Sequence, residues 1–269
     1  MSLFGSGNPI LNDQTFSSVG PWGNLGAEAR PGVMSVRGTA TATMILLGIV
    51  AASAMLVWTY LINSPLYLAA TFGGSLLGCI LVAIAHWKPK ASPYLALPIA
   101  VSEGAFAGGM SIFWSHYIEG RVAAGVSGTV TSLGSGLVVQ SFLLTVAIAA
   151  GVLLLNMTNV ARATPRFVAI FSAAMFGLFA VSMLTWILAI FNVRVPYIWD
   201  NGIIGIGFAG FVVVMAASSL VMDFDQVRLG AANGYPKHME WLSAIGLLVT
   251  LVWLYTSILR LLAQLNRRD

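Results

Sequence analysis

An acidic side chain lies inside a long apolar stretch, where an ionised group is costly. Glu103 belongs to the run 94–117 and lies about 14 Å, by helical rise, from its nearer end. Ionisable residues within a membrane span are rare and usually mark an ion or proton pathway. The alternative is a protonated glutamic acid that bonds a neighbouring carbonyl and holds two helices together. Gly104 and Gly108 follow at the G-x-x-x-G spacing, which predicts close packing against another helix.

Two aspartates close a later apolar run, in the segment Val221-Met-Asp-Phe-Asp-Gln-Val-Arg228. Asp223 and Asp225 are two residues apart, which is about 200° around a helix, so their carboxylates cannot share one face. We expect one to point into the bundle and the other toward solvent or Arg228. Two acids at the C-terminal end of a helix oppose its macrodipole, which favours a functional role over a plain interfacial acid pair.

Other catalytic or metal-binding chemistry is not indicated. The single cysteine, Cys79, excludes an internal disulfide and a cysteine-based metal cluster. His86, His116 and His238 lie at the ends of apolar runs without metal-ligand spacing. Ser127 has no histidine inside a run to activate it, and neither a His-Glu-x-x-His motif nor a nucleotide-binding glycine loop occurs. We therefore expect neither an enzyme nor a cofactor or tightly bound metal.

The elements that would hold these acids in place are membrane spans. The 269 residues are 58% hydrophobic and only 8% charged, with a mean hydropathy of +0.88, whereas a soluble domain carries roughly 25% charged residues. Lipid-exposed backbone must satisfy its own hydrogen bonds, which favours helices. The sequence thus predicts an all-α integral membrane protein with seven spans. The apolar runs are Thr43–Ile62, Leu66–Ala85, Tyr94–Tyr117, Gly136–Leu155, Phe167–Phe191, Gly202–Met222 and Glu240–Leu262.

The remaining segments divide the chain into a tail and a membrane domain. Residues 1–42 are polar and glycine-rich, so we expect a disordered cytoplasmic tail; residues 43–265 form the seven-helix transmembrane domain. The small-residue segment 122–135 is expected to be a surface loop between the third and fourth spans.

The distribution of Lys and Arg predicts the orientation. With the N-terminus inside, eight of them lie in inner segments and two in outer loops, a clear positive-inside bias. The inner ones are Arg30, Arg37, Lys88, Lys90, Arg162, Arg166, Arg228 and Lys237, and the outer ones are Arg121 and Arg194. Because these charges lie in loops and tails, they are not read as a nucleic-acid surface. Arg260, Arg267 and Arg268 conflict with the bias, since seven spans place the C-terminus outside.

Several motifs along the chain resemble those of the Bax inhibitor-1/YccA-like family, in particular its bacterial branch with an N-terminal tail. The motifs are Asn8-Pro-Ile-Leu-Asn12, Thr15-Phe16, Glu103-Gly104, Gly205-Ile-Gly-Phe208, Asp223-Phe-Asp225, Pro236-Lys-His-Met-Glu-Trp241, the run from Leu247 to Tyr255, and Ile258-Leu-Arg-Leu-Leu262. The resemblance covers residues 7–265, and its last sixty residues are the most specific part.

This resemblance implies a bundle in which the last helix is central and the other six surround it, together with a calcium leak that responds to pH. It also implies a proton-sensitive latch between an acid near the end of span six and an acid inside span seven. Asp223 matches the first position, with Asp225 as the other register. No acid lies between Trp241 and Leu265, so Glu240 is the nearest substitute for the second.

Two functions from different classes follow. The first is a passive, gated calcium leak in the bacterial plasma membrane, in which Glu103, Asp223, Asp225 and Glu240 line an ion or proton path and bind Ca²⁺ transiently. The second is a regulatory membrane protein without transport activity, which modulates a membrane-bound ATP-dependent protease, as some members of the family do. The long polar tail favours the second function.

Overall fold

The computed structural model describes residues 32–122, 130–157, 164–191 and 202–266. The predicted disorder of the first 31 residues falls outside this part. Within the described residues, seven helices are long and apolar enough to cross a membrane, which confirms the predicted all-α seven-helix fold. The helices are α2 (Val36–Leu61), α3 (Leu66–Trp87), α4 (Ser92–Val122), α5 (Val130–Met157), α6 (Pro165–Ile190), α8 (Ile203–Ala232) and α9 (Met239–Leu265), with a short 3₁₀ helix, η1 (Pro89–Ala91), before α4.

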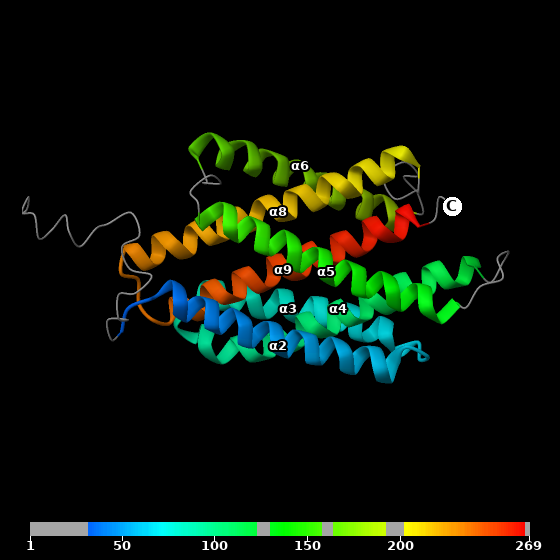
Figure 1. Ribbon diagram of the computed structural model, residues 1–269, viewed down its shortest axis with the longest axis horizontal. Helices are drawn as coiled ribbons and strands as arrows, with labels where there is room; N and C mark the ends of the chain where they lie inside the picture. The colour runs from blue at the N-terminus through cyan, green and yellow to red at the C-terminus, as the bar shows by residue number, and fades with distance from the viewer. Residues whose placement is uncertain (1–31, 123–129, 158–163, 192–201, 267–269) are drawn as a thin grey trace, which may run out of the picture.

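The last helix is the centre of the bundle. α9 contacts α2, α3, α4, α5 and α8, and Figure 1 shows it running between the layer of α2, α3 and α4 and the layer of α6 and α8. Its most apolar stretch is also the most buried of the seven. The prediction that all six other helices surround it needs one correction, because α6 contacts α8 and no other described helix. α6 is packed on the outside of the bundle.

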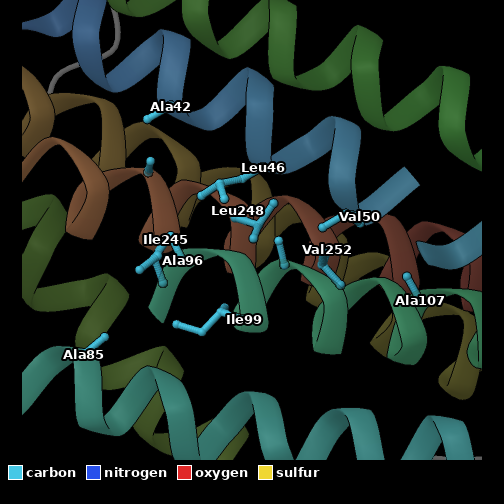
Figure 2. Close-up of a cluster of buried hydrophobic side chains, with 12 residues drawn as sticks. Ala42, Leu46, Val50, Ala85, Ala96, Ile99, Ala107, Ile245, Leu248 and Val252 are labelled. Atoms are coloured by element: carbon cyan, nitrogen blue, oxygen red, sulfur yellow. The ribbon is translucent and has the colours of Figure 1, made fainter. Parts of the chain in front are cut away.

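The core forms where α9 meets α2 and α4. Figure 2 shows Leu46 and Val50 of α2, Leu248 and Val252 of α9, and Ile99 of α4 converging in one buried cluster. Helix association in lipid depends on close packing, because lipid tails are as apolar as the side chains they would replace. Small residues on α4 supply that packing. A Cβ on Gly104 would lie 2.6 Å from the Val50 carbonyl oxygen, and one on Gly108 would lie 2.7 Å from the Ala54 carbonyl oxygen.

Several helices extend beyond the boundaries that hydropathy predicted. α2 begins at Val36 rather than at Thr43, and α8 ends at Ala232, ten residues beyond Met222. Asp223 and Asp225 therefore lie within α8, and the predicted conflict with a helix C-terminus does not arise. Hydropathy falls wherever polar residues begin, whereas the hydrogen-bonded helix continues into the interfacial region.

The expected 122–135 loop is also shorter than predicted. Val122 ends α4 and α5 begins at Val130, so residues 130–135 are helical. The connection that remains, residues 123–129, lies outside the described residues.

The chain start and the α8–α9 connection lie at the same end of the bundle. The Met34 amide donates to the Tyr235 carbonyl at 2.7 Å, and the Lys237 amide donates to the Gly32 carbonyl at 3.0 Å. Gly234, with φ of +68°, provides the left-handed turn that ends α8. Figure 1 shows α9 ending at the opposite end of the molecule. Seven helices thus separate the two ends of the described chain, and Arg260 lies toward the end of the bundle opposite the start of α2.

Candidate functional site

Asp223 lies on α8 about 14 Å, by helical rise, from the end of the helix at Ala232. Its half-buried side chain faces α9, where the Thr250 hydroxyl is its polar neighbour. Its Oδ2 atom is shielded from solvent and has no hydrogen-bond partner among the described residues. A buried carboxylate oxygen without a donor is unfavourable unless a proton or a cation accompanies it. Asp223 is therefore an acid with one carboxylate oxygen that no described residue satisfies.

A cavity of about 300 Å³ lies beside this carboxylate, between α3, α8 and α9. The Asp223 cavity is lined by Val82, His86, Asp223, Gln226, Val227, Met239, Leu242, Ser243, Ile245 and Gly246. Most of this lining is apolar, while Gln226 and Ser243 add oxygen atoms and His86 adds a titratable ring. No group of three or more His, Cys, Asp or Glu side chains that could hold a metal ion occurs in the described ranges. Asp223, Gln226 and Ser243 supply the side-chain oxygens of this lining, which are fewer than the six to eight oxygen ligands that Ca²⁺ takes.

Asp225 has a different environment, although it is only two residues away. It is 8% exposed and accepts a hydrogen bond of 2.9 Å from the Asn156 side chain on α5. The two aspartates point to different neighbours, as the helical angle predicted. The expectation that one of them faces solvent is wrong, because Asp225 is buried against α5 and Asp223 is half-buried against α9, while a contact with Arg228 stays a prediction. It joins two helices and does not line the Asp223 cavity.

Glu240 ties the first helix to the last. Its side chain is 6% exposed, and its Oε1 atom accepts from both the amide and the hydroxyl of Ser35, each at 2.9 Å. The Ser35 hydroxyl in turn accepts from the Gly38 amide at 2.9 Å. In an ordinary capping box, a glutamate three residues after the N-cap bonds the N-cap amide. Here that position is Gly38, and the carboxylate comes from α9 instead.

Gly38 makes this arrangement possible because it has no side chain. A Cβ at this position would overlap the Glu240 carboxylate. Ser35, Gly38 and Glu240, together with the backbone bonds between residues 32–34 and 235–237, are called the α2–α9 clasp below. The sequence suggested Glu240 as a partner for Asp223. In the structure, the Glu240 carboxylate instead accepts hydrogen bonds from Ser35 at the start of α2. Glu240 lies ten residues before Thr250, the α9 residue that faces Asp223.

Glu103 lies between α4 and α3. Its Oε1 atom is 3.2 Å from where a Cβ of Gly78 would be, so this glycine makes room for the carboxyl group. Glu103 does not line the Asp223 cavity. A path from Glu103 to Asp223 requires the third and sixth spans to face each other, but α4 and α8 make no contact in the described ranges and both pack against α9. The two acids therefore belong to separate places in the bundle.

A comparison with family models identifies the family of this chain. A model described as Bax inhibitor 1 like matches residues 8–267, which is nearly the whole chain. The chain belongs to the Bax inhibitor 1-like family. No curated protein matches it, and no solved structure does. Family membership and the seven apolar helices together establish a multi-pass membrane protein whose surroundings are a lipid bilayer.

In this Bax inhibitor 1-like chain, the two positions of the expected latch do not both carry acids. Asp223 faces the Thr250 hydroxyl, and no Asp or Glu follows Glu240 along the rest of α9. A hydroxyl can donate to a carboxylate but cannot share its charge or its proton in the way a second carboxyl group can. Asp223 is therefore the one acid at this place that can respond to protons, and the His86 ring is the other titratable group of the cavity lining.

Sequence reasoning missed three polar residues of these sites: Thr250, His86 and Asn156. Thr250 interrupts the apolar run Leu247–Trp253, and Asn156 ends an otherwise apolar helix, so each gave a weak signal. His86 was identified only as a histidine at the end of an apolar run, without metal-ligand spacing. His86 lines the same cavity as Asp223 of α8, and no local sequence pattern shows that these two residues lie near each other.

Proposed function

We propose that this family member is a gated cation leak of the bacterial plasma membrane, with calcium as the favoured ion and Asp223 as the group that binds the ion or a proton. The observations that support this most strongly are the unsatisfied Oδ2 of Asp223 and the half-open cavity of about 300 Å³ that Asp223 lines between α3, α8 and α9. An isolated negative charge at this depth attracts a cation, or is neutralised by a proton, and either event changes what can pass.

The chemistry of the lining is suited to a passing divalent cation. Calcium prefers six to eight oxygen ligands, and the cavity offers the Asp223 carboxylate, the Gln226 amide oxygen and the Ser243 hydroxyl, with water for the remainder. Such a set binds weakly, and conduction requires weak binding so that the ion is released again. With the N-terminus in the cytoplasm, as the charge bias predicts, the Asp223 cavity lies in the cytoplasmic half of the protein.

The test is calcium flux into liposomes that contain the purified protein, measured with an enclosed calcium dye from about pH 5 to about pH 8. We expect wild-type flux to change with pH, because a proton and a cation compete for Asp223. Asp223→Asn resembles the protonated state at every pH, so its flux should be the same throughout the range. Asp225→Asn is the matched control, and it should keep the pH response. A pH response that survives in Asp223→Asn would contradict the proposal.

A second function, regulation of a membrane-bound ATP-dependent protease, is favoured by the α2–α9 clasp. The clasp fixes residues 32–34 against the α8–α9 connection, so the tail leaves the bundle from a defined place at one end. Co-purification of a protease with the full chain, lost on deletion of residues 2–30 while calcium flux is absent in both proteins, would decide for regulation. Flux without any protease partner would decide for the leak.

A further inference from the structure

Two walls of the Asp223 cavity are formed by residues that lie close to the α2–α9 clasp. Met239 and Ser243, from the first turns of α9, line the cavity on one side, and Val227 of α8 lines it on another. Glu240 lies between the two α9 residues, and its carboxylate is bound at the start of α2. The clasp therefore fixes the part of α9 that forms one wall of the cavity.

Met34, which precedes α2, packs behind both walls. It is 3% exposed and belongs to one buried cluster with Val227 of α8 and Leu247 of α9, against which Met239 also packs. Its sulfur atom is 3.0 Å from where a Cβ of Gly230 would be, so this glycine of α8 leaves room for the side chain. The start of the described chain thus supports α8 and α9 together, next to the cavity.

The segment that carries Met34 is attached to the bundle by few interactions. Residues 32–35, called the strap below, make two backbone hydrogen bonds to the α8–α9 connection and two to the Glu240 carboxylate. Within the strap Gly32 is exposed and Met34 is the one buried side chain. A short extended segment with so few contacts opens at a lower free energy than the helices of the bundle do. Its release would remove the support of both cavity walls without unfolding a helix.

We propose that the strap is an autoinhibitory contact of the Asp223 cavity. When it is bound, α8 and α9 are held together and cations are kept from the carboxylate; when it is released, the cavity opens to water and cations enter. This inference rests on the proposed leak, because it concerns the control of the same cavity. The strap contributes no residue to the lining, so it sets the fraction of molecules that conduct, whereas Asp223 sets the pH response.

The strap can be locked with an engineered disulfide. Val33 and Pro236 face each other in an isolated antiparallel bridge, and the backbone bonds of Met34 and Lys237 flank them, so they form a non-hydrogen-bonded pair. Cα atoms in such a pair are about 4.5 Å apart, which a disulfide can span. The test protein is the full chain with Val33→Cys, Pro236→Cys and Cys79→Ala, reconstituted in liposomes and either oxidised or reduced.

We expect calcium flux through the oxidised protein to be about tenfold lower than through the reduced protein, because the disulfide removes the released state from the ensemble. Cys79→Ala alone is the control, and its flux should not depend on the redox state. Flux that is equal in the oxidised and reduced forms of the test protein, or higher in the oxidised form, would overturn the strap and leave the proposed leak intact.

A second measurement examines the cavity without calcium flux. Ser243→Cys, in the chain with Cys79→Ala, places a thiol in the lining, and mass spectrometry follows its labelling by a water-soluble maleimide. Adding Ser35→Ala removes the hydroxyl that binds Glu240 and should make this labelling several-fold faster. Ser141→Cys is the matched control, because Ser141 is buried on α5 and does not line the cavity.

Faster labelling that is confined to Ser243→Cys would support the strap, and it would do so even in a protein that passes no calcium, in which case the leak alone would be contradicted. Equal labelling of Ser243→Cys with and without Ser35→Ala would overturn the strap. An equal acceleration in Ser141→Cys would overturn it as well, since it would show a general loosening of the bundle.

Discussion

Glu240 and Asp223 are both acids on membrane helices near the same end of the bundle, and their surroundings differ in one decisive respect. Glu240 is buried with two donors on one of its oxygens, both from Ser35. Asp223 has an oxygen without any partner among the described residues and a cavity beside it. An acid whose hydrogen bonds come from the protein stabilises the fold, whereas an acid with one oxygen left unpaired is available to a proton or ion. Burial alone does not separate these two roles.

The largest effect on stability should come from adding a methyl group to the α2–α9 clasp. Gly38→Ala places a Cβ where the Glu240 carboxylate lies, so the carboxylate must move and its bonds to Ser35 are lost. We expect the free energy of unfolding to fall by about 3 kcal/mol, measured by denaturant or thermal unfolding of the purified protein.

Gly48→Ala is the control for this substitution. It lies in the same helix, and no atom lies within 4 Å of the position where its Cβ would be. Its stability should therefore be unchanged or slightly higher, since alanine favours a helix over glycine. Equal losses in the two variants would mean that the clasp contributes nothing specific.

A smaller loss is expected when the shape of Glu240 is kept and its charge is removed. Glu240→Gln retains an oxygen that can accept from Ser35, but the two hydrogen bonds are no longer charge-assisted. The free energy of unfolding should fall by about 1.5 kcal/mol, while the pH response of calcium flux persists. A lost pH response with unchanged stability would assign Glu240 to the ion path and remove the contrast with Asp223.

The same kind of substitution at Asp223 should leave stability almost unchanged. Asp223→Asn removes a charge that the protein does not compensate, so we expect the free energy of unfolding to change by about 0.5 kcal/mol or less. Together with the flux experiment, this predicts opposite outcomes for the two acids. Glu240→Gln should lower stability and keep the pH response of calcium flux, whereas Asp223→Asn should keep stability and lose the pH response. A loss as large as that of Glu240→Gln would show that Asp223 is a structural residue.

The smallest effect on flux is expected at Glu103. This residue lies beside Gly78 between α3 and α4 and is not part of the Asp223 cavity. Glu103→Gln should therefore alter calcium flux less than Asp223→Asn does, and it should leave the pH response in place. If Glu103→Gln abolishes flux while the protein remains folded, the ion path passes through the α3–α4 interface instead.

Much of the fold follows from the sequence, because lipid restricts what a chain can do. Long apolar runs identify seven spans, and Gly104 and Gly108 lie where α4 approaches α2 closely. The ends of the helices cannot be predicted from the apolar runs, since α8 continues beyond its apolar part into a segment that contains both aspartates. Apolar residues mark the part of a helix that lies in the hydrocarbon layer of the membrane, and the helix can continue beyond that layer.

The candidate site is less accessible to sequence reasoning, because its members meet only through the tertiary structure. The angle between Asp223 and Asp225 is a local property and could be predicted. The partners of both acids, Thr250 and Asn156, come from other helices, and no local pattern contains that information. Glu240 shows the same limit, since the residue that binds it, Ser35, is 205 positions earlier in the chain.

The position of α6 has a consequence for how the protein is handled. Because α8 is its only described protein neighbour and none of its most apolar stretch is buried, lipid supports most of its surface. Its place then depends on the thickness and composition of the surrounding bilayer. Extraction into a micelle removes that support, so α6 should be the first helix to shift in solubilised protein, and nanodiscs are the better medium for studying it.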